Sequence, residues 1–96
     1  MKIDFIKENG VLNVQLEGRL DTLTSSELDN FFRDNLVGVN EVIIDCANLV
    51  YVSSAGLRVL LSTHKKMKEA MKLKNVQDLV MEVFEITGFV DFLVIE

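Results

Sequence analysis

Apolar and polar residues alternate near the start of the chain. The segment from Val11 to Glu17 alternates, with three apolar residues on one face and three polar residues on the other, a period of two that is typical of a strand with one buried face. The apolar residues are Leu12, Val14 and Leu16, and the polar ones are Asn13, Gln15 and Glu17. The dipeptide Asn9-Gly10 comes just before this strand and is a strong signal for a two-residue hairpin turn. The pattern therefore predicts an antiparallel hairpin whose first strand runs from Lys2 to Lys7.

Two longer segments carry apolar residues at helical spacing. Thr24 and Glu27 match a capping box, which predicts a first helix from about Ser25 to Leu36. The segment Ser53-Ser54-Ala55-Gly56 opens a second helix that ends in a basic last turn, which suits the helix dipole. Its apolar face is expected to hold Leu57, Leu60, Leu61 and His64.

The remaining elements are shorter. Val42-Ile43-Ile44 is a β-branched run that ends at Asp45, and its lack of alternation predicts a central strand covered on both faces. Weak alternation predicts another strand over residues 71–76. A third helix follows, capped by Asn75 or Asp78 and stopped by Gly88. Residues 90–95 are then expected to form the last strand.

The resulting order of elements is β-β-α-β-α-β-α-β. Strands that are separated by helices run mostly parallel, with right-handed crossovers. With 96 residues and 49% hydrophobic residues, the chain is long enough for one domain with its own core and too short for two. We therefore expect a single α/β domain over residues 1–96, with helices packed on a mixed sheet.

Charge and composition exclude several classes of function. The net charge of −5 disfavours binding to nucleic acid and to anionic membranes. No apolar run approaches the roughly 20 residues that a membrane span needs, and the first residues do not resemble a signal peptide. One cysteine and one histidine provide neither an internal disulfide nor a zinc site. We expect a cytoplasmic protein with no bound metal.

Catalytic chemistry finds little support in the sequence. Asp21 and Asp45 form a possible carboxylate pair, but the chain lacks a nucleophile with its base, a glycine-rich phosphate loop and a third metal ligand. Loop capping by Asp21 and a strand-end turn at Asp45 are the simpler roles. Cys46 and His64 are expected to pack in or beside the core. We therefore predict neither an enzyme nor a cofactor.

The segment from Asp45 to Leu61, DCANLVYVSSAGLRVLL, resembles the signature of STAS domains in anti-sigma factor antagonists. In that family a strand ending in Asp leads through a loop to a Ser-Gly-Leu helix start. The segments Gly18-Arg19-Leu20-Asp21 and Glu85-Ile86-Thr87-Gly88-Phe89 also match the family at their positions. The resemblance covers almost the whole chain, and it implies the STAS fold.

The resemblance also implies a function. In the family the serine at the position of Ser54 accepts phosphate from a partner that is both anti-sigma factor and serine kinase, and a metal-dependent phosphatase removes it. The unphosphorylated form captures the kinase and frees the sigma factor. The implied partner-binding surface is formed by the helix start and the loops near it, namely Asp21, Asn48, Ser53, Ser54, Ala55, Gly56 and Arg58.

The chain departs from the family pattern in three places. Ser53 stands where relatives often carry an acidic residue, so a contact made by that carboxylate is not expected here. The connection from Lys68 to Met71 lacks the glycine that relatives usually have, and the final helix of relatives has no counterpart within these 96 residues. If the chain has not been shortened, we expect a dimer contact or a partner to cover the surface on which that helix normally packs. The protein itself is expected to be a monomer or a weak dimer.

Other interpretations remain open at this point. Serine pairs before Ala-Gly-Leu are common helix caps, and we expect that role for Ser53. A STAS subunit of a transport or stress-sensing complex would bind through the same surface without being phosphorylated. A nucleotide-binding module is a third possibility, because α/β sheets bind ligands at the carboxyl ends of their strands.

Overall fold

A five-stranded sheet with the strand order β1-β2-β3-β4-β5 forms the framework of the protein. The computed structural model describes all residues, Met1–Glu96. β1 pairs with β2 in antiparallel fashion, and β2, β3, β4 and β5 are parallel to one another. The strands are β1 (Lys2–Glu8), β2 (Val11–Leu20), β3 (Glu41–Val52), β4 (Met71–Lys74) and β5 (Val94–Ile95).

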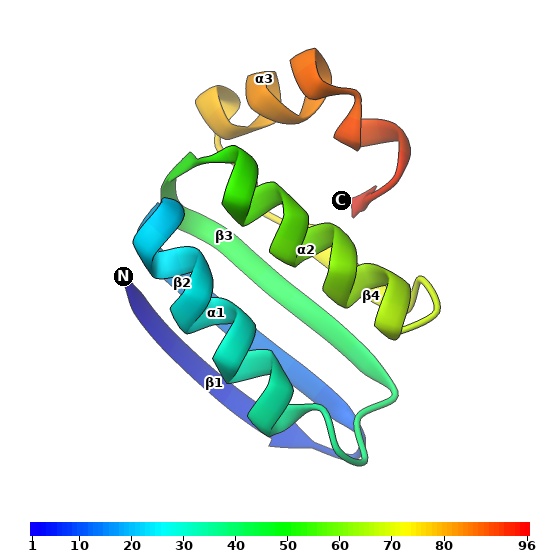
Figure 1. Ribbon diagram of the computed structural model, residues 1–96. Coiled ribbons are helices and arrows are strands. Elements are labelled where there is room, and N and C mark those ends of the chain that lie inside the picture. Colours follow the sequence, from blue (N-terminus) through cyan, green and yellow to red (C-terminus); the bar gives the residue numbers. More distant parts are fainter.

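The helices connect the parallel strands. α1 and α2 lie side by side over one face of the sheet, and α3 lies beyond α2, next to the chain end (Figure 1). The predicted order β-β-α-β-α-β-α-β and the parallel crossovers are confirmed. The helices are α1 (Thr22–Asn35), α2 (Ser54–Lys66) and α3 (Asp78–Thr87), and a short 3₁₀ turn, η1 (Phe89–Asp91), follows α3.

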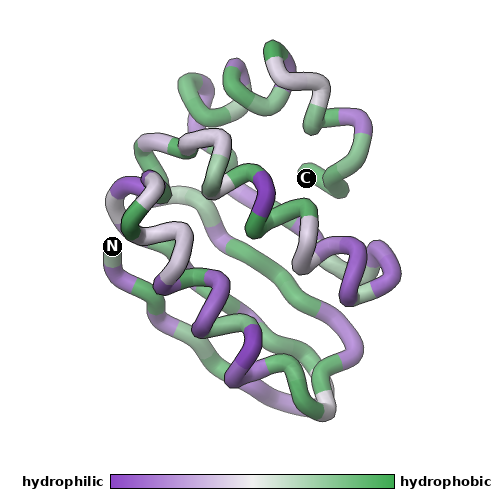
Figure 2. Tube along the Cα trace, in the orientation of Figure 1, coloured by the Kyte–Doolittle hydropathy of each residue, from purple (hydrophilic) through white to green (hydrophobic).

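The hydrophobic core lies between the sheet and the helices. Burial alternates along β3, where Val42, Ile44 and Cys46 are buried and Ile43 is only half-buried. The prediction that this strand is covered on both faces is wrong, because α1 and α2 cover one face (Figure 1). Hydrophilic positions recur along α1 and at the end of α2, between hydrophobic ones (Figure 2), as expected for helices with one buried side.

The predicted hairpin is confirmed. Asn9 and Gly10 both adopt positive φ angles, 51° and 78°, which is the backbone that a tight two-residue hairpin turn requires. β1 pairs with β2 along its whole length, from Lys2 opposite Glu17 to Glu8 opposite Val11. The local turn signal therefore fixed both the topology and the register of this part of the sheet.

The first helix begins earlier than predicted. α1 starts at Thr22 rather than Ser25, and its cap is Asp21 rather than Thr24. The Asp21 carboxylate accepts the backbone N–H groups of the second and third helical residues, both at 3.0 Å. In return, the Thr24 hydroxyl oxygen accepts the backbone N–H of Asp21 at 2.8 Å. The capping box is thus formed by Asp21 and Thr24, and Glu27 takes no part in it.

β3 continues well beyond the predicted end at Asp45. Its pairing with β2 is irregular between Gln15 and Glu17, which is how a bulge interrupts a strand. The Asp45 carboxylate accepts the backbone N–H of Ala47 at 3.0 Å and the side-chain amide of Asn75 at 3.1 Å. Asp45 therefore has a structural role inside a long strand, and the strand-end turn predicted for it is wrong.

Three boundaries in the second half also differ from the prediction. α3 is capped by Gln77 without a side-chain hydrogen bond, rather than by Asn75 or Asp78, whereas the predicted stop at Gly88 is confirmed by its φ of 78°. The predicted last strand over residues 90–95 is reduced to Val94–Ile95, because η1 occupies its first part. Residues 71–76 form a strand only up to Lys74.

The turn after α2 lacks the glycine expected there. Lys68 and Glu69 adopt positive φ angles of 53° and 70°, a region that costs a non-glycine residue about 1 kcal/mol. The turn is closed by backbone hydrogen bonds from Glu69 to His64 and from Ala70 to Met67. The chain therefore turns from α2 into β4 without a glycine, with Lys68 and Glu69 in a strained backbone conformation.

Candidate partner-binding site at two helix starts

The starts of α1 and α2 lie next to each other because β2 and β3 are parallel and end together. Leu20, the last residue of β2, pairs with Val52, the last residue of β3. The backbone N–H of Ser53 donates to the carbonyl oxygen of Leu20 at 2.8 Å. The topology therefore brings Asp21 and Ser53, the two helix caps, to the same edge of the sheet.

Gly56 allows α2 to approach β2 closely. A Cβ atom at this position would lie 2.6 Å from Cγ of Leu20, closer than nonbonded atoms can pack, and 3.0 Å from its carbonyl oxygen, which is a tight contact. Gly56 is buried. Its inclusion in the partner-binding surface is therefore wrong, and its role is to fit α2 against the end of β2.

The two neighbouring serines differ in their surroundings. The Ser53 hydroxyl oxygen accepts the backbone N–H of Gly56 at 3.2 Å, so Ser53 is the N-cap of α2. This confirms the capping role that the sequence predicted for Ser53. Ser54 is the first residue of α2, is exposed, and its hydroxyl makes no hydrogen bond within the chain. A second protein can therefore reach the Ser54 hydroxyl without disturbing the cap.

Asp21 is the other polar group of the two helix starts. The backbone N–H of Thr24 donates to the Asp21 carboxylate and lowers its pKa below the ordinary value. Partial burial of the carboxylate acts in the opposite direction and raises the pKa. The Thr24 hydroxyl, the backbone N–H of Leu23 and the charge of Arg19 lower it further. Asp21 therefore carries a negative charge beside the start of α2, although its oxygens are already engaged by α1.

The other predicted surface residues occupy different positions. Arg58 is exposed one turn after Ser54, and Ala55 is half-buried between them. Asn48 is exposed in the body of β3, five residues before Ser53. At about 3.3 Å per residue, this places it on the order of 15 Å from the helix starts. The structure brings Asp21, Ser53, Ser54 and Arg58 together, and it does not bring Asn48 to them.

The sequence analysis missed the exposed apolar residues near this edge. Leu23 in the first turn of α1 is 82% exposed, and Val50 near the end of β3 is 48% exposed. Tyr51 is 38% exposed, and the guanidinium of Arg19 stacks on its ring at 4.1 Å. These residues could have been recognised in the sequence as apolar residues at positions that the helix or strand period assigns to the exposed side. These exposed apolar residues add apolar surface to the polar groups of the edge.

The remaining reactive side chains lie in the core. Burial raises the pKa of the Cys46 thiol to about 12, and the charge of Asp45 adds to the effect, so the thiol is protonated at neutral pH and is a poor nucleophile. His64 is buried, and its Nδ1 has no hydrogen-bond partner in the structure. The prediction that both residues pack in or beside the core is confirmed.

No three acidic, histidine or cysteine side chains gather in a way that would hold a metal ion. The helices are also too short or too polar for any of them to cross a bilayer. What the edge offers is an exposed hydroxyl with polar and apolar neighbours, an arrangement suited to contact with a protein.

Comparison with known proteins assigns the family. The family model of the STAS domain matches residues 2–96. The chain belongs to the STAS domain family. It is 33% identical over 93 residues to BtrV of Bordetella bronchiseptica, which is assigned to the anti-sigma factor antagonists, and the match covers 93% of this chain and 80% of the relative. The anti-sigma-B factor antagonist of Staphylococcus epidermidis is 27% identical over 97 residues, covering 97% of this chain and 90% of the relative.

Solved structures of STAS proteins share the fold. The anti-sigma factor antagonist SpoIIAA in its unphosphorylated form has a TM-score of 0.83 at 16% identity, covering 99% of this chain and 88% of that chain. The phosphorylated form of SpoIIAA from Bacillus has a TM-score of 0.74 at 15% identity, covering 99% of this chain and 91% of that chain. The resemblance to STAS domains of anti-sigma factor antagonists and the predicted fold class are therefore confirmed.

Proposed function

We propose that this STAS protein is an anti-sigma factor antagonist that is switched by phosphorylation of Ser54. In the unphosphorylated state it binds an anti-sigma factor with serine kinase activity in the cytoplasm, and the sigma factor is released. It acts as a binding protein and a kinase substrate rather than as an enzyme. The observation that carries the proposal is the exposed Ser54 hydroxyl at the first turn of α2, free of any hydrogen bond within the chain.

The position of Ser54 explains how a phosphate can be added without unfolding the domain. The kinase would transfer the γ-phosphoryl group of a nucleoside triphosphate to the Ser54 oxygen, releasing the diphosphate, and the hydroxyl proton would pass to a base on the kinase. Helix starts tolerate negative charge, because their backbone N–H groups point outward. The first turn of α2 contains no acidic residue that would repel the phosphate, and the cap is formed by Ser53.

The same phosphate would oppose partner binding. It adds about 1.5 to 2 negative charges at an edge where Asp21 already carries one. A partner docked there would meet like-charge repulsion and would have to desolvate the phosphate, costs that amount to several kcal/mol in protein interfaces. The apolar contact at Leu23 would remain, but the centre of the surface would become unfavourable. A metal-dependent serine phosphatase would reverse the switch.

The test is phosphate transfer and binding with the cognate kinase. Wild-type protein and the Ser53→Ala variant should incorporate phosphate, and Ser54→Ala should not, as measured by mass spectrometry after incubation with kinase and ATP. Ser54→Ala should bind the kinase constitutively. Ser54→Asp should bind at least tenfold more weakly in calorimetry, because a fixed charge of the same sign would occupy the surface.

Three outcomes would contradict the proposal. Full-affinity binding by Ser54→Asp would show that charge at this position does not control docking. Kinase binding without phosphate transfer to Ser54 would favour a STAS subunit that acts in a transport or stress-sensing complex without being phosphorylated. A thermal shift with nucleotide alone, which a true ligand would produce by mass action, would favour a nucleotide-binding module.

A further inference from the structure

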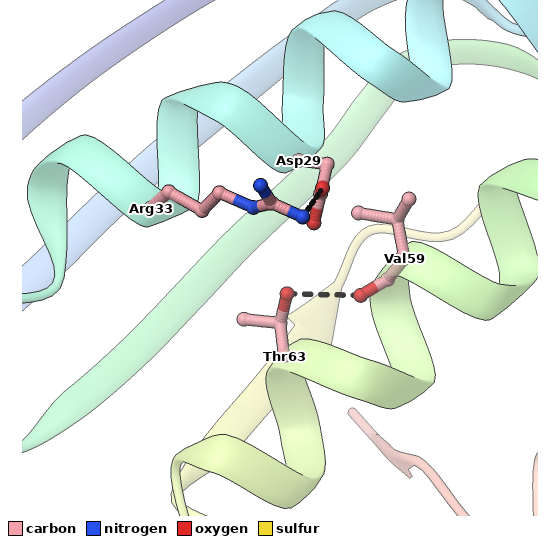
Figure 3. Close-up of polar contacts among 4 residues, drawn as sticks. All are labelled: Asp29, Arg33, Val59 and Thr63. Atoms are coloured by element: carbon pink, nitrogen blue, oxygen red, sulfur yellow. Dashed lines mark hydrogen bonds and ion pairs between the residues drawn. The ribbon is translucent and has the colours of Figure 1, made fainter.

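Arg58 is the one arginine of the chain whose guanidinium has no partner in the structure. Arg33 forms an ion pair with Asp29 at 3.0 Å (Figure 3), and Arg19 stacks on the Tyr51 ring at 4.1 Å. Arg58 is exposed and takes part in no ion pair or aromatic contact. A guanidinium that is free in this way is available for a ligand or a modification.

Arg58 and Ser54 are placed to meet on the surface of α2. They are four residues apart in the same helix, and side chains with this spacing are neighbours on a helix surface. Helical side chains lean toward the helix N-terminus, so a long side chain at position 58 can extend over the turn that contains Ser54. An anion four residues before a cation is also the more favourable orientation of such a pair.

No other group of α2 competes for either residue. The helix contains no aspartate or glutamate, and the Ser54 hydroxyl has no internal hydrogen bond. The neighbouring Asp21 carboxylate is engaged by the start of α1. The lysines at the end of α2 begin at Lys65, eleven residues after Ser54, which is about 16 Å along a helix.

We propose that Arg58 binds the phosphate on Ser54 and holds it against the surface of α2. Arg58 would be a positioning residue of the switch, and a planar guanidinium can donate two parallel hydrogen bonds to phosphate oxygens. This inference rests on the proposed function, since it assumes that Ser54 is the phosphorylated residue.

The pair would give the switch a second effect. In the unphosphorylated form the guanidinium of Arg58 is free to bind a carboxylate or carbonyl group of the partner. Phosphorylation would engage this cation internally, so the docking surface would lose a positive contact at the same time as it gains negative charge. A carboxylate at position 54 is shorter and carries less charge, so Ser54→Asp should reproduce the effect only in part.

The test uses the full chain with phosphoserine installed directly at position 54. The second pKa of the phosphate is measured by ³¹P NMR titration at low ionic strength, in the wild-type background and with Arg58→Gln. An ion pair favours the doubly charged phosphate, so Arg58→Gln should raise this pKa by about 0.3 units, and the difference should shrink at high salt. The Arg58 side-chain N–H resonance should shift on phosphorylation of the wild-type protein.

Lys65→Gln is the matched control, because it removes the same charge from the same helix outside the reach of the phosphate. A pKa that does not change in Arg58→Gln, or that changes equally in Lys65→Gln, would overturn the inference. Because the phosphate is installed without a kinase, this failure is distinct from that of the proposed function, which would appear as a kinase that does not modify Ser54.

Discussion

The two helix starts at the carboxyl edge of the sheet are built differently. α1 is capped by a carboxylate, and both its charge and its hydrogen bonds are engaged by the helix that it caps. α2 is capped by the neutral hydroxyl of Ser53, and the next residue, Ser54, is exposed and free. One helix start thus holds a permanent charge, whereas the other is neutral and can acquire one.

Under the proposed function, this difference assigns the structural task to Ser53 and the regulatory task to its neighbour Ser54. If the cap of α2 were the modified residue, phosphorylation would rearrange the hydrogen bond that holds the start of the helix. With the cap at Ser53, the hydroxyl proposed for phosphorylation contributes no hydrogen bond to the fold. The separation depends on the close contact between Gly56 and Leu20, which holds the two helix starts together.

The largest effect is expected for Gly56→Ala. The added methyl group would collide with the side chain and carbonyl oxygen of Leu20, and overpacking of this kind costs about 1–3 kcal/mol of unfolding free energy. The loss is measured by urea denaturation, with Ser62→Ala at an exposed position of the same helix as the control. An unchanged denaturation midpoint would mean that α2 is free to move away from β2.

A smaller effect separates the two serines. Ser53→Ala removes the cap of α2 and should reduce the unfolding free energy by about 1 kcal/mol, whereas Ser54→Ala should change it by less than about 0.5 kcal/mol. Both are measured by urea denaturation under the same conditions. A larger loss in Ser54→Ala than in Ser53→Ala would reverse the roles assigned to the two hydroxyl groups.

The smallest effect concerns the charge on Asp21. Its pKa is lowered in the folded state, so the ionised carboxylate contributes stability above the pKa of the unfolded chain, and this contribution is lost as the pH falls through the folded pKa. Asparagine is also a good cap but does not titrate. The stability advantage of the wild type over Asp21→Asn should therefore decrease in acid.

Denaturation midpoints of the two proteins at pH 6 and at several values below pH 4.5 would measure this change. A gap between them that stays constant or widens in acid would contradict the role of the Asp21 charge at the start of α1.

Local signals predicted much of the fold. The Asn9-Gly10 turn and the helix stop at Gly88 depend on a backbone conformation that few residues adopt, so they can be identified from a dipeptide or a single residue. The order of elements followed from the periodicity of the apolar residues. These features are determined by neighbours in the sequence, and the structure agrees with them.

The errors arose where distant parts of the chain decide the outcome. β3 extends past Asp45 because it continues to pair with β2 after a bulge, up to Val52 opposite Leu20, a pairing that no local pattern reveals. The last strand is short because Leu93 and its neighbours follow a 3₁₀ turn instead of pairing with β4. The coverage of only one sheet face depends on where the helices pack.

The candidate site was predicted only in part, because some of its features also depend on distant parts of the chain. The resemblance to STAS domains pointed to Ser54 and Asp21, whose roles in partner binding stay predictions, and cap chemistry pointed to Ser53, which does cap α2. The burial of Gly56 depends on its contact with Leu20, thirty-six residues earlier in the chain. The exposure of Leu23 depends on the true start of α1, which the sequence placed three residues too late.

The Ser54 hydroxyl makes no hydrogen bond within the chain, and this affects how long each form of the protein would persist in the cell. If the phosphorylated and unphosphorylated proteins have the same folding stability, proteases degrade them and chaperones bind them at similar rates. Both forms can then persist as long-lived pools. Under the proposed function, the ratio of the two pools would then be set by the relative rates of the proposed kinase and phosphatase. Differences in folding stability would not change that ratio.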